Sequence, residues 1–277
     1  MGRLVRVDAE LVRRKLAPSR QRARELVEAG RVLLDGEVVR KTARQMDPAQ
    51  ALLVVESPKE DYVSRGAHKL IGALDWLGDD GPSIGGARCL DAGASTGGFT
   101  DVLLRRGAKH VVAVDVGYGQ IAWRLREDPR VTVVERTNVR TLDPAVVAPP
   151  PGLVVGDLSF ISLTLVIPAL VRAADSHADF LLMVKPQFEV GKELLGRGGV
   201  VRKTSLHARA MREVAACAAA NGLSALGVAP SPLPGPAGNV EYFLYMRAGE
   251  ADHGSVDMES AIEKAIAEGP AGENARS

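Results

Sequence analysis

The feature that most constrains the fold is the stretch CLDAGASTGGFTDVLL at residues 89–104. It reads as a short apolar strand, an acidic residue, a glycine-rich turn and then a helical pattern of apolar residues. Strand and helix patterns go on alternating to residue 247, with apolar runs such as HVVAV and LLMV. Continuous apolar strands are buried on both faces. The sequence therefore predicts an α/β fold in which helices cover both faces of a mostly parallel sheet.

The turn itself points to a particular cofactor. Gly93, Gly97 and Gly98 lack the G-x-G-x-x-G spacing with which dinucleotide folds approach a pyrophosphate. Small side chains, two hydroxyls and a helix N-terminus instead suit the carboxylate of a small zwitterion. Asp115 ends the next strand, where an acid suits the two hydroxyls of a ribose. We predict S-adenosylmethionine, an amino acid joined to a nucleoside. The alternatives are a tight connection without ligand and a nicotinamide cofactor, which the glycine spacing disfavours.

Charge is distributed unevenly along the 277 residues. Residues 1–46 carry 12 Lys or Arg and six Asp or Glu, whereas residues 249–277 carry two basic and seven acidic residues. A basic end suits a polyanionic partner. The acidic end is rich in Gly, Ala and Ser and has little to bury, so we expect it to be disordered.

The basic segment has the organisation of a small domain. It predicts a helix over about residues 9–15, a second helix that Ser19 caps and Gly30 ends, and a hairpin at Asp35-Gly36. Arg20 and Arg24 lie one turn apart on the second helix. Such a face can neutralise phosphates, although an ordinary solvated helix face would have the same charges.

The stretch RVDAELVRRKLAPSRQRARELVEAGRVLLDGEVVRKTARQM resembles the S4 RNA-binding domain. The leading Arg-Val-Asp, the Ser-Arg before the second helix, the Gly-Arg-Val and the Asp-Gly hairpin carry the resemblance. It implies binding to structured RNA, often ribosomal RNA. The predicted RNA-binding residues are Arg3, Arg6, Arg20, Arg22, Arg24, Lys41, Arg44 and Arg65.

The glycine turn resembles the first motif, D-x-G-x-x-x-G-G-F, of the Rossmann-like methyltransferases. That resemblance implies a seven-stranded sheet with an antiparallel last strand, and an adenine contact from Asn138, which could equally be an ordinary turn residue. The predicted cofactor-binding residues are Gly93, Ala94, Ser95, Thr96, Gly97, Gly98, Phe99, Asp115, Val116, Asn138 and Asp157.

Two observations exclude classes of atom as the acceptor of the methyl group. Amino-directed enzymes of this fold commonly have Asn-Pro-Pro-aromatic after the fourth strand, where this chain has Asp-Leu-Ser-Phe at residues 157–160. Methylation of carbon 5 of a pyrimidine needs a cysteine nucleophile. Cys89 and Cys217 both lie in apolar or alanine-rich surroundings typical of a core. An oxygen acceptor remains.

Four ionisable residues are candidates for the chemistry. Asp157 and Lys185 end strands, and Glu241 begins the last strand, so an antiparallel last strand would bring all three to one edge of the sheet. Lys69, on the helix before the first strand, can join them. The order resembles the Lys-Asp-Lys-Glu tetrad of FtsJ-like ribose 2′-O-methyltransferases. Our hypothesis is that Lys185 is the base, that Asp157 orients lysine and cofactor, and that Lys69 and Glu241 position the ribose. The alternatives are a solvated lysine and a helix-capping aspartate at strand ends.

The predicted domains are an S4-like domain (residues 1–62), a linker (63–67), a Rossmann-like methyltransferase domain (68–248) and the acidic tail (249–277). This combination is identified as a member of the TlyA family. The family implies a methyltransferase that acts on cytidine 2′-hydroxyls in ribosomal RNA of the small subunit, the large subunit or both. The family also bears the name hemolysin, so a cytolytic protein and a non-catalytic RNA-binding assembly factor remain as alternatives.

Composition limits the setting of this activity. The two cysteines indicate neither a disulfide framework nor a metal cluster, which favours a reducing cytoplasm and predicts no metal. No stretch approaches 18 uninterrupted apolar residues, so we expect no membrane partner. The glycine-rich, basic stretch GKELLGRGGVVRK (residues 191–203) is either a loop that closes over RNA beside the site or a disordered surface loop.

Overall fold

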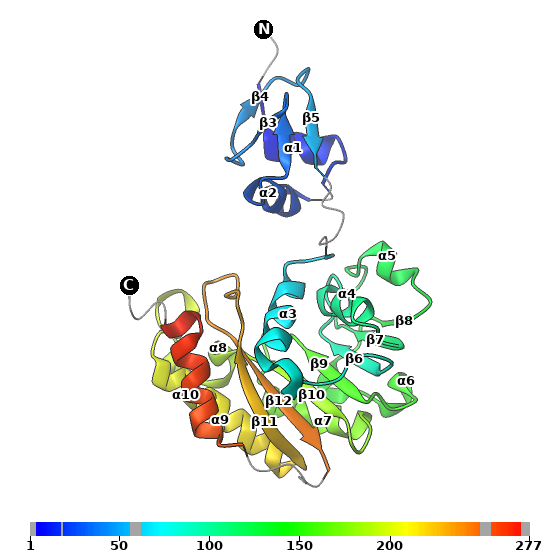
Figure 1. Cartoon of the computed structure of the whole chain (residues 1–277), viewed down its shortest axis with the longest axis vertical. Helices are drawn as coiled ribbons and strands as arrows, with labels where there is room; N and C mark the ends of the chain where they lie inside the picture. Colours follow the sequence, from blue (N-terminus) through cyan, green and yellow to red (C-terminus); the bar gives the residue numbers. More distant parts are fainter. Residues whose placement is uncertain (1–3, 18, 56–61, 250–255, 273–277) are drawn as a thin grey trace. The chain divides into compact units, whose positions relative to one another are not determined.

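The computed structural model describes residues 4–17, 19–55, 62–249 and 256–272. The chain divides into two compact units, residues 1–61 and 62–277, each with its own arrangement of helices and strands (Figure 1).

The small unit packs two helices and short strands around one apolar core, to which Leu11, Val27 and Leu34 contribute. Three strands form an antiparallel sheet in the order β3-β2-β5, and β1 pairs with β4. Its elements are β1 (Val5–Arg6), α1 (Val7–Arg13), α2 (Arg20–Glu28), β2 (Val32–Leu34), β3 (Glu37–Val38), β4 (Gln45–Met46) and β5 (Leu52–Val54).

Two local predictions for this unit are confirmed. The Ser19 hydroxyl accepts a hydrogen bond from the backbone N–H of Arg22 at 3.1 Å, so Ser19 caps α2. Asp35 and Gly36 adopt φ values of 50° and 86°, and β2 and β3 pair antiparallel on either side of them. The second helix ends at Glu28 rather than at Gly30, which follows in the left-handed region with φ 67°.

The large unit is a seven-stranded sheet in the order β11-β12-β10-β9-β6-β7-β8, in which β12 alone runs antiparallel to its neighbours. This confirms the Rossmann-like methyltransferase fold. The strands are β6 (Arg88–Ala92), β7 (His110–Val114), β8 (Val131–Val134), β9 (Leu153–Gly156), β10 (Asp179–Val184), β11 (Leu223–Pro230) and β12 (Tyr242–Ala248).

Helices cover both faces of this sheet because the strand residues alternate between two buried clusters. One face packs against α3 (Gly66–Leu77), α4 (Gly98–Arg105) and α5 (Trp123–Arg126). The other packs against α6 (Pro144–Val147), α7 (Ile167–Ala173) and α9 (Thr204–Ala220). The four-residue α8 (Pro186–Glu189) follows β10.

Two helical segments of the large unit are short. Residues 120–126 contain only α5, and residues 162–174 form a 3-10 turn (Leu163–Leu165) followed by α7. Pro168 lies in the first turn of α7, where its missing N–H is tolerated, so it marks a helix start rather than a helix interior.

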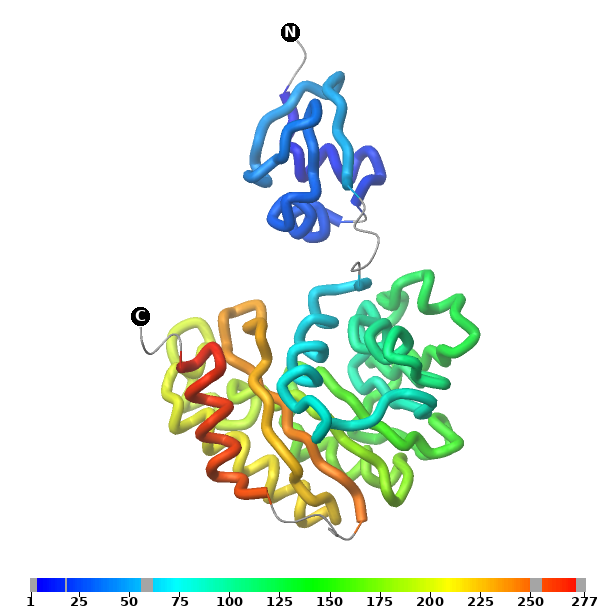
Figure 2. The backbone as a smooth tube through the Cα atoms, viewed as in Figure 1, coloured from blue at the N-terminus to red at the C-terminus, as the bar shows by residue number. Residues whose placement is uncertain are grey.

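The prediction of a disordered tail is wrong over residues 258–268. These residues form α10 (Met258–Glu268), which packs along β11 and α9 (Figure 2). Ile262 and Ala265 are buried against the same cluster as α9, so the segment does have an apolar face despite its acidic composition. Residues 250–255 and 273–277 of the predicted tail lie outside the described part.

The junction between the units is also more structured than a linker. Helix α3 begins at Gly66, so the last two residues of the predicted linker, Gly66 and Ala67, belong to it. Ala67 is buried, and the backbone N–H of Val63 donates to the Asp101 carboxylate at 2.9 Å.

Candidate functional site

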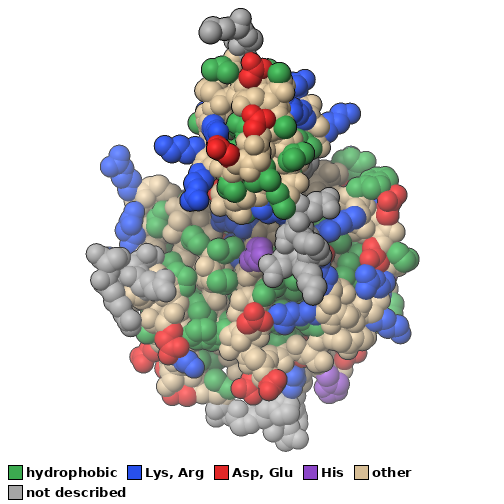
Figure 3. All heavy atoms as spheres, turned by 45° about the horizontal axis from the view of Figure 1, so that its top comes forward, with side chains coloured by type: hydrophobic (Ala, Val, Ile, Leu, Met, Phe, Trp, Pro, Cys, Tyr) green, Lys and Arg blue, Asp and Glu red, His purple; other side chains and the backbone are tan. Residues whose placement is uncertain are grey.

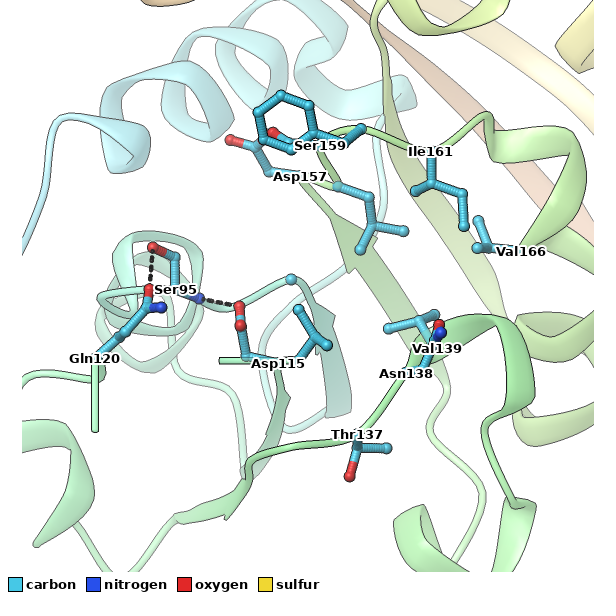
Figure 4. A pocket seen from close by; sticks show the side chains of 14 residues that line it. Ser95, Asp115, Gln120, Thr137, Asn138, Val139, Asp157, Ser159, Ile161 and Val166 are labelled. Carbon is cyan, nitrogen blue, oxygen red and sulfur yellow. Dashed lines mark hydrogen bonds between the residues drawn. The ribbon is translucent and has the colours of Figure 1, made fainter. Parts of the chain in front are cut away.

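The carboxyl ends of β6, β7, β8 and β9 border a pocket of about 480 Å³ in the large unit (Figure 4). Six of the predicted cofactor-binding residues line it: Gly93, Ser95, Asp115, Val116, Asn138 and Asp157. Its position at the carboxyl edge of a parallel sheet is the usual one for ligands in such folds.

Asp115 occupies the centre of this pocket wall. One carboxylate oxygen accepts from the backbone N–H of Ser95 and the other from that of Gly117, both at 2.7 Å. The Ser95 hydroxyl also meets the Gln120 side chain at 3.4 Å (Figure 4). The glycine turn and the end of β7 thus hold the acid in a fixed orientation, with acceptor capacity left on both oxygens.

Asn138 lines the pocket and also caps the 3-10 turn that follows. Its side-chain oxygen accepts from the backbone N–H of Arg140 at 3.0 Å. The structural role that the sequence offered as the alternative is therefore present, and the adenine contact stays a prediction.

Five predicted cofactor residues do not lie on the pocket wall, because they shape the turn instead: Ala94, Thr96, Gly97, Gly98 and Phe99. Phe99 is buried against Phe243, with ring centroids 5.9 Å apart. A Cβ on Gly97 would lie 2.3 Å from Leu125, and one on Gly98 would lie 2.9 Å from the backbone nitrogen of Ala67. These positions require glycine for packing within the protein.

Gly93 fits a close backbone approach at the pocket. It has φ 87°, and a Cβ there would lie 2.8 Å from the Asp157 carbonyl oxygen. The ends of β6 and β9 can therefore come together only because residue 93 has no side chain. Because residue 93 has no side chain, no side-chain atoms cover the backbone of the turn at the pocket wall.

Asp91, at the end of β6, is a residue to which the sequence analysis gave no role. One carboxylate oxygen accepts from both the N–H and the hydroxyl of Thr100, while the other, equally buried, has no hydrogen-bond partner in the described structure. Burial raises the pKa of Asp91 to about 7. An unpaired carboxylate oxygen next to the turn fits a ligand with an ammonium group, as the amino-acid end of S-adenosylmethionine has.

The four predicted catalytic residues come together at the same edge of the sheet. Lys69 Nζ lies 2.5 Å from Glu241 Oε2 and 4.0 Å from Asp157 Oδ2, and Lys185 Nζ lies 2.5 Å from Asp157 Oδ1. The antiparallel register pairs Val184 with Tyr242, which places Lys185 and Glu241 opposite each other. The last strand is antiparallel, as the prediction required, and Asp157, Lys185 and Glu241 do lie at one edge of the sheet.

Burial makes this cluster unusual among charged groups. Lys69, Lys185 and Glu241 are 6%, 5% and 1% exposed. Buried charges persist in proteins when they are paired, and here two ammonium groups face two carboxylates. Two ammonium groups share the Asp157 carboxylate, which also lines the pocket, so the paired charges adjoin the ligand space.

Lys185 has a further partner that the sequence analysis did not single out. Its Nζ donates to the Ser159 hydroxyl at 2.8 Å, and Ser159 lines the pocket. Gln120 and Thr137 are likewise lining residues without an earlier assignment. Their positions depend on how the loops after β7, β8 and β9 turn, which strand patterns do not reveal.

Neither cysteine has the environment of a nucleophile. Burial raises the pKa of the Cys89 thiol to about 12, and Cys217 points its sulfur at the Thr164 carbonyl at 3.6 Å. Across the described residues, no group of three His, Cys, Asp or Glu side chains is arranged to hold a metal ion. In the same described part, no helix has the length and apolar composition needed to cross a membrane.

The predicted RNA-binding residues of the small unit differ in their partners. Arg6 forms a two-pronged ion pair with the buried Asp8, which Arg20 also approaches at 3.5 Å. Arg44 approaches Glu37 at 3.5 Å. Figure 3 shows Lys and Arg side chains projecting from this unit on the face in view.

The remaining predicted RNA contacts fall into three groups. Arg24 and Lys41 are exposed and have no ion-pair partner among the described residues, whereas Arg22 pairs with Glu25. Arg65, in the large unit, donates to the carbonyl oxygen of Pro234 at 2.9 Å. Arg3 lies outside the described residues.

The basic stretch at residues 191–203 is an ordered loop. Asn239 bridges it, donating to the Gly199 carbonyl at 3.0 Å and accepting from the Val201 N–H at 2.9 Å. The Val201 carbonyl lies 2.9 Å from the ring of the buried His207, whose pKa burial lowers. The disordered alternative is therefore wrong.

Comparison with known proteins agrees with this geometry. The family description "FtsJ-like methyltransferase" matches residues 62–248, and "S4 domain" matches residues 5–49. The 16S/23S rRNA (cytidine-2′-O)-methyltransferase TlyA of Mycobacterium tuberculosis is 55% identical over 98% of this chain and 100% of its own. Hemolysin A of Brachyspira hyodysenteriae is 34% identical over 82% of this chain and 93% of its own.

A solved structure from Streptococcus thermophilus, described as a hemolysin, is 35% identical, covers 99% of both chains and superposes with a TM-score of 0.74. Both family matches, the whole-length identity and the assembled Lys-Asp-Lys-Glu cluster lead to the same assignment. This chain belongs to the FtsJ-like methyltransferases and, with its S4 domain, to the TlyA family.

Proposed function

We propose that this chain is an S-adenosylmethionine-dependent methyltransferase that methylates the 2′-oxygen of cytidine in ribosomal RNA. The observation that carries the proposal is the paired cluster of Lys69, Asp157, Lys185 and Glu241 beside the pocket. The M. tuberculosis relative supports the substrate, since it acts on cytidine in 16S and 23S rRNA. Work on ribosomal subunits would place the protein in the cytoplasm.

Residues of the pocket fit the cofactor. The Asp115 carboxylate has acceptor capacity for the ribose hydroxyls. Beside the turn but outside the pocket lining, the buried and unpartnered oxygen of Asp91 suits an ammonium group. The bare backbone at Gly93 allows close approach of the ligand. S-Adenosylmethionine, when bound, supplies a methyl group on a sulfonium, so that the S–C electron pair returns to sulfur as the new O–C bond forms.

The chain's own residues supply the rest of the chemistry. A ribose hydroxyl is a weak nucleophile until it loses its proton, and Lys185 in its neutral form takes that proton on Nζ. Asp157 holds the Lys185 side chain, while Lys69 and Glu241 position the acceptor ribose. General-base assistance of this kind contributes about 10²–10⁴-fold, and fixed orientation at least as much.

The S4 domain supplies the affinity for RNA. Its exposed cations, including Arg24 and Lys41, contact phosphates and set the position of the chain on the ribosomal subunit without reading the sequence of bases. The ordered loop 191–203 adds Lys192, Arg197 and Arg202 near the beginning of β12, where RNA flanking the target can pass.

The decisive experiment maps ribose methylation on ribosomal subunits from cells lacking this activity. Separate 30S and 50S subunits are incubated with labelled S-adenosylmethionine and the protein, and each methylated nucleotide is identified. We expect label on cytidine 2′-oxygens, and the two subunits tested apart show whether one or both are substrates. Label on a base atom would contradict the proposal. Ribosome binding without label would establish the assembly-factor alternative.

A hemolytic activity is the second candidate, because two of the relatives bear that name. If this chain is cytolytic by itself, it should release haemoglobin from erythrocytes, and variants that abolish methyl transfer should release it equally. We expect no release from either the wild type or the Lys185→Ala variant.

A further inference from the structure

We propose that Ser159 is a positioning residue for methyl transfer, which orients the amino group of Lys185 toward the acceptor ribose. The inference rests on the proposed function and adds a residue outside the Lys-Asp-Lys-Glu tetrad. It also assigns a purpose to the Asp-Leu-Ser-Phe segment that follows β9.

The evidence is the set of neighbours around Lys185 Nζ. Asp157 Oδ1 lies at 2.5 Å and the Ser159 hydroxyl at 2.8 Å, and the Lys185 residue is 5% exposed. The face of the Phe188 ring lies farther away, with its centroid 6.0 Å from Nζ. Both close partners are acceptors that lie two residues apart on one segment, whereas Lys185 follows the neighbouring strand β10.

Two acceptors are the number that a basic lysine needs. A neutral amine has two N–H bonds and one lone pair, arranged roughly as a tetrahedron around nitrogen. The Ser159 hydroxyl accepts one N–H bond of Lys185, and the Asp157 carboxylate lies 2.5 Å from Nζ as its ion-pair partner, without a hydrogen bond in the described structure. A small rotation of the amine lets Asp157 accept the second N–H bond, and the lone pair then points in the one remaining direction. A ribose hydroxyl in that direction can give its proton to Nζ. Without Ser159, the amine can rotate about its bond to Cε, and the lone pair loses its fixed direction.

The segment that carries Ser159 is fastened to the helix that follows Lys185. Glu189, the last residue of α8, accepts from the Ser162 hydroxyl at 2.5 Å and from the Leu163 N–H at 2.9 Å. The rings of Phe160 and Phe188 also lie against each other, with centroids 5.3 Å apart. These contacts fix the spacing between Ser159 and Lys185 from both sides.

The Ser159 side chain makes little contribution to packing in the described structure. Its side chain is exposed at the pocket rim (Figure 4), and Lys185 is its hydrogen-bond partner in the described structure. Removal of the hydroxyl therefore tests orientation with little effect on core packing. Threonine at this position keeps the hydroxyl and serves as the conservative variant.

The kinetic test compares wild type with Ser159→Ala and Ser159→Thr. We expect Ser159→Ala to lower kcat by about 10- to 100-fold, while KM for RNA and Kd for S-adenosylmethionine change by less than about threefold. Ser159→Thr should recover most of the lost kcat. The matched control is Ser260→Ala, which removes an exposed serine hydroxyl bonded to Asp257 on α10, far from the chemistry, and should leave kcat unchanged.

A second readout needs no cofactor. NMR of ¹⁵N-labelled lysine amino groups, assigned through Lys185→Ala, reports the rate of hydrogen exchange at Lys185 Nζ. We expect faster exchange in Ser159→Ala, recovery in Ser159→Thr and no change in Ser260→Ala. The inference is overturned if Ser159→Ala has the same kcat as the wild type, or if its affinity for S-adenosylmethionine falls as much as its kcat does. It is also overturned if Ser159→Thr is no more active than Ser159→Ala. A wild type that methylates no ribose fails the proposed function instead, and the NMR comparison then decides the orientation of Lys185 alone.

Discussion

Lys185 is the side chain on which the proposed chemistry most depends. It contacts Asp157 and Ser159 but does not line the cofactor pocket. We therefore expect Lys185→Ala to reduce kcat by about 10²–10⁴-fold, the usual value of general-base assistance, with unchanged affinity for S-adenosylmethionine. Single-turnover methylation and calorimetric binding separate the two effects. Loss of cofactor binding in this variant would refute the role of base, and Lys109→Ala, at the amino end of β7, serves as the control.

A substitution at Gly93 should have the opposite effect to Lys185→Ala, because it should weaken cofactor binding. A methyl group at this position meets the Asp157 carbonyl at 2.8 Å, and φ 87° disfavours any side chain. We expect Gly93→Ala to weaken cofactor binding by more than about tenfold and to cost about 1–2 kcal/mol of stability from the backbone alone. Calorimetric binding and thermal unfolding measure these changes. A variant that binds the cofactor as the wild type does would show that the turn does not approach the ligand.

The buried carboxyl group of Asp91 makes stability depend on pH. Burial raises its pKa from an ordinary value of 3.8 to about 7, so the folded state holds a proton that the unfolded state has lost. Between about pH 4 and 7 the folded state binds more protons, and the free energy of unfolding falls as pH rises. Asp91→Asn removes this term, so its stability relative to wild type should increase by roughly 1–4 kcal/mol from pH 4 to pH 8. Urea unfolding at several pH values tests this, and a difference independent of pH would contradict it.

At the scale of elements, the strands were predictable and the loops between them were not. Runs of Val and Leu locate β7, β9 and β10 because a strand buried on both faces needs apolar residues throughout. The ends of those strands then place Asp157, Lys185 and Glu241, since strand direction alone determines which edge they reach. These three members of the tetrad therefore follow from topology once the last strand is antiparallel, whereas Lys69, on α3, was joined to them through the resemblance to FtsJ-like enzymes.

Contacts set by turn geometry could not be read in this way. Two hydrogen bonds, from Lys185 to Ser159 and from Ser162 to Glu189, depend on loop backbone angles such as φ 66° at Phe160. The same limit applies to α10. Its two buried apolar residues are too few to outweigh an acidic composition when only the sequence is considered.

Helix α10 covers the edge strand β11, and its apolar contacts rather than its ion pairs should stabilise it. Ile262 is 1% exposed, so Ile262→Ala should cost about 2–5 kcal/mol. Glu259 forms an ion pair with Arg212 in which both side chains are about half exposed, so Glu259→Ala should lower the stability much less than Ile262→Ala does. Thermal unfolding of the two variants provides the comparison. Equal losses would show that the helix is held by charge.

At the scale of the whole molecule, the excess of positive charge and the proposed catalytic residues lie in different units. The excess of cations lies in residues 1–46, whereas the tetrad and the pocket belong to the large unit. Most of the salt dependence of RNA binding should therefore come from the small unit.

The double variant Arg24→Ala/Lys41→Ala tests this division. Both side chains are exposed without ion-pair partners in the described structure, so their loss should lower the slope of log affinity against log salt by about 1–2. Methyl transfer at saturating RNA should remain within about twofold of wild type. A salt slope equal to that of wild type, measured by titration of ribosomal subunits, would contradict the assignment, and Lys109→Ala is the matched control.

The insertion of β12 between β10 and β11 has a consequence for the timing of activity. Glu241 binds Lys69 from 172 positions farther along the chain, so Lys69 has no carboxylate from this segment until β12 has joined the sheet. Closure of the ionisable cluster therefore reports that the two ends of the large unit have come together. A chain that folds without inserting β12 keeps the glycine turn but lacks the complete cluster.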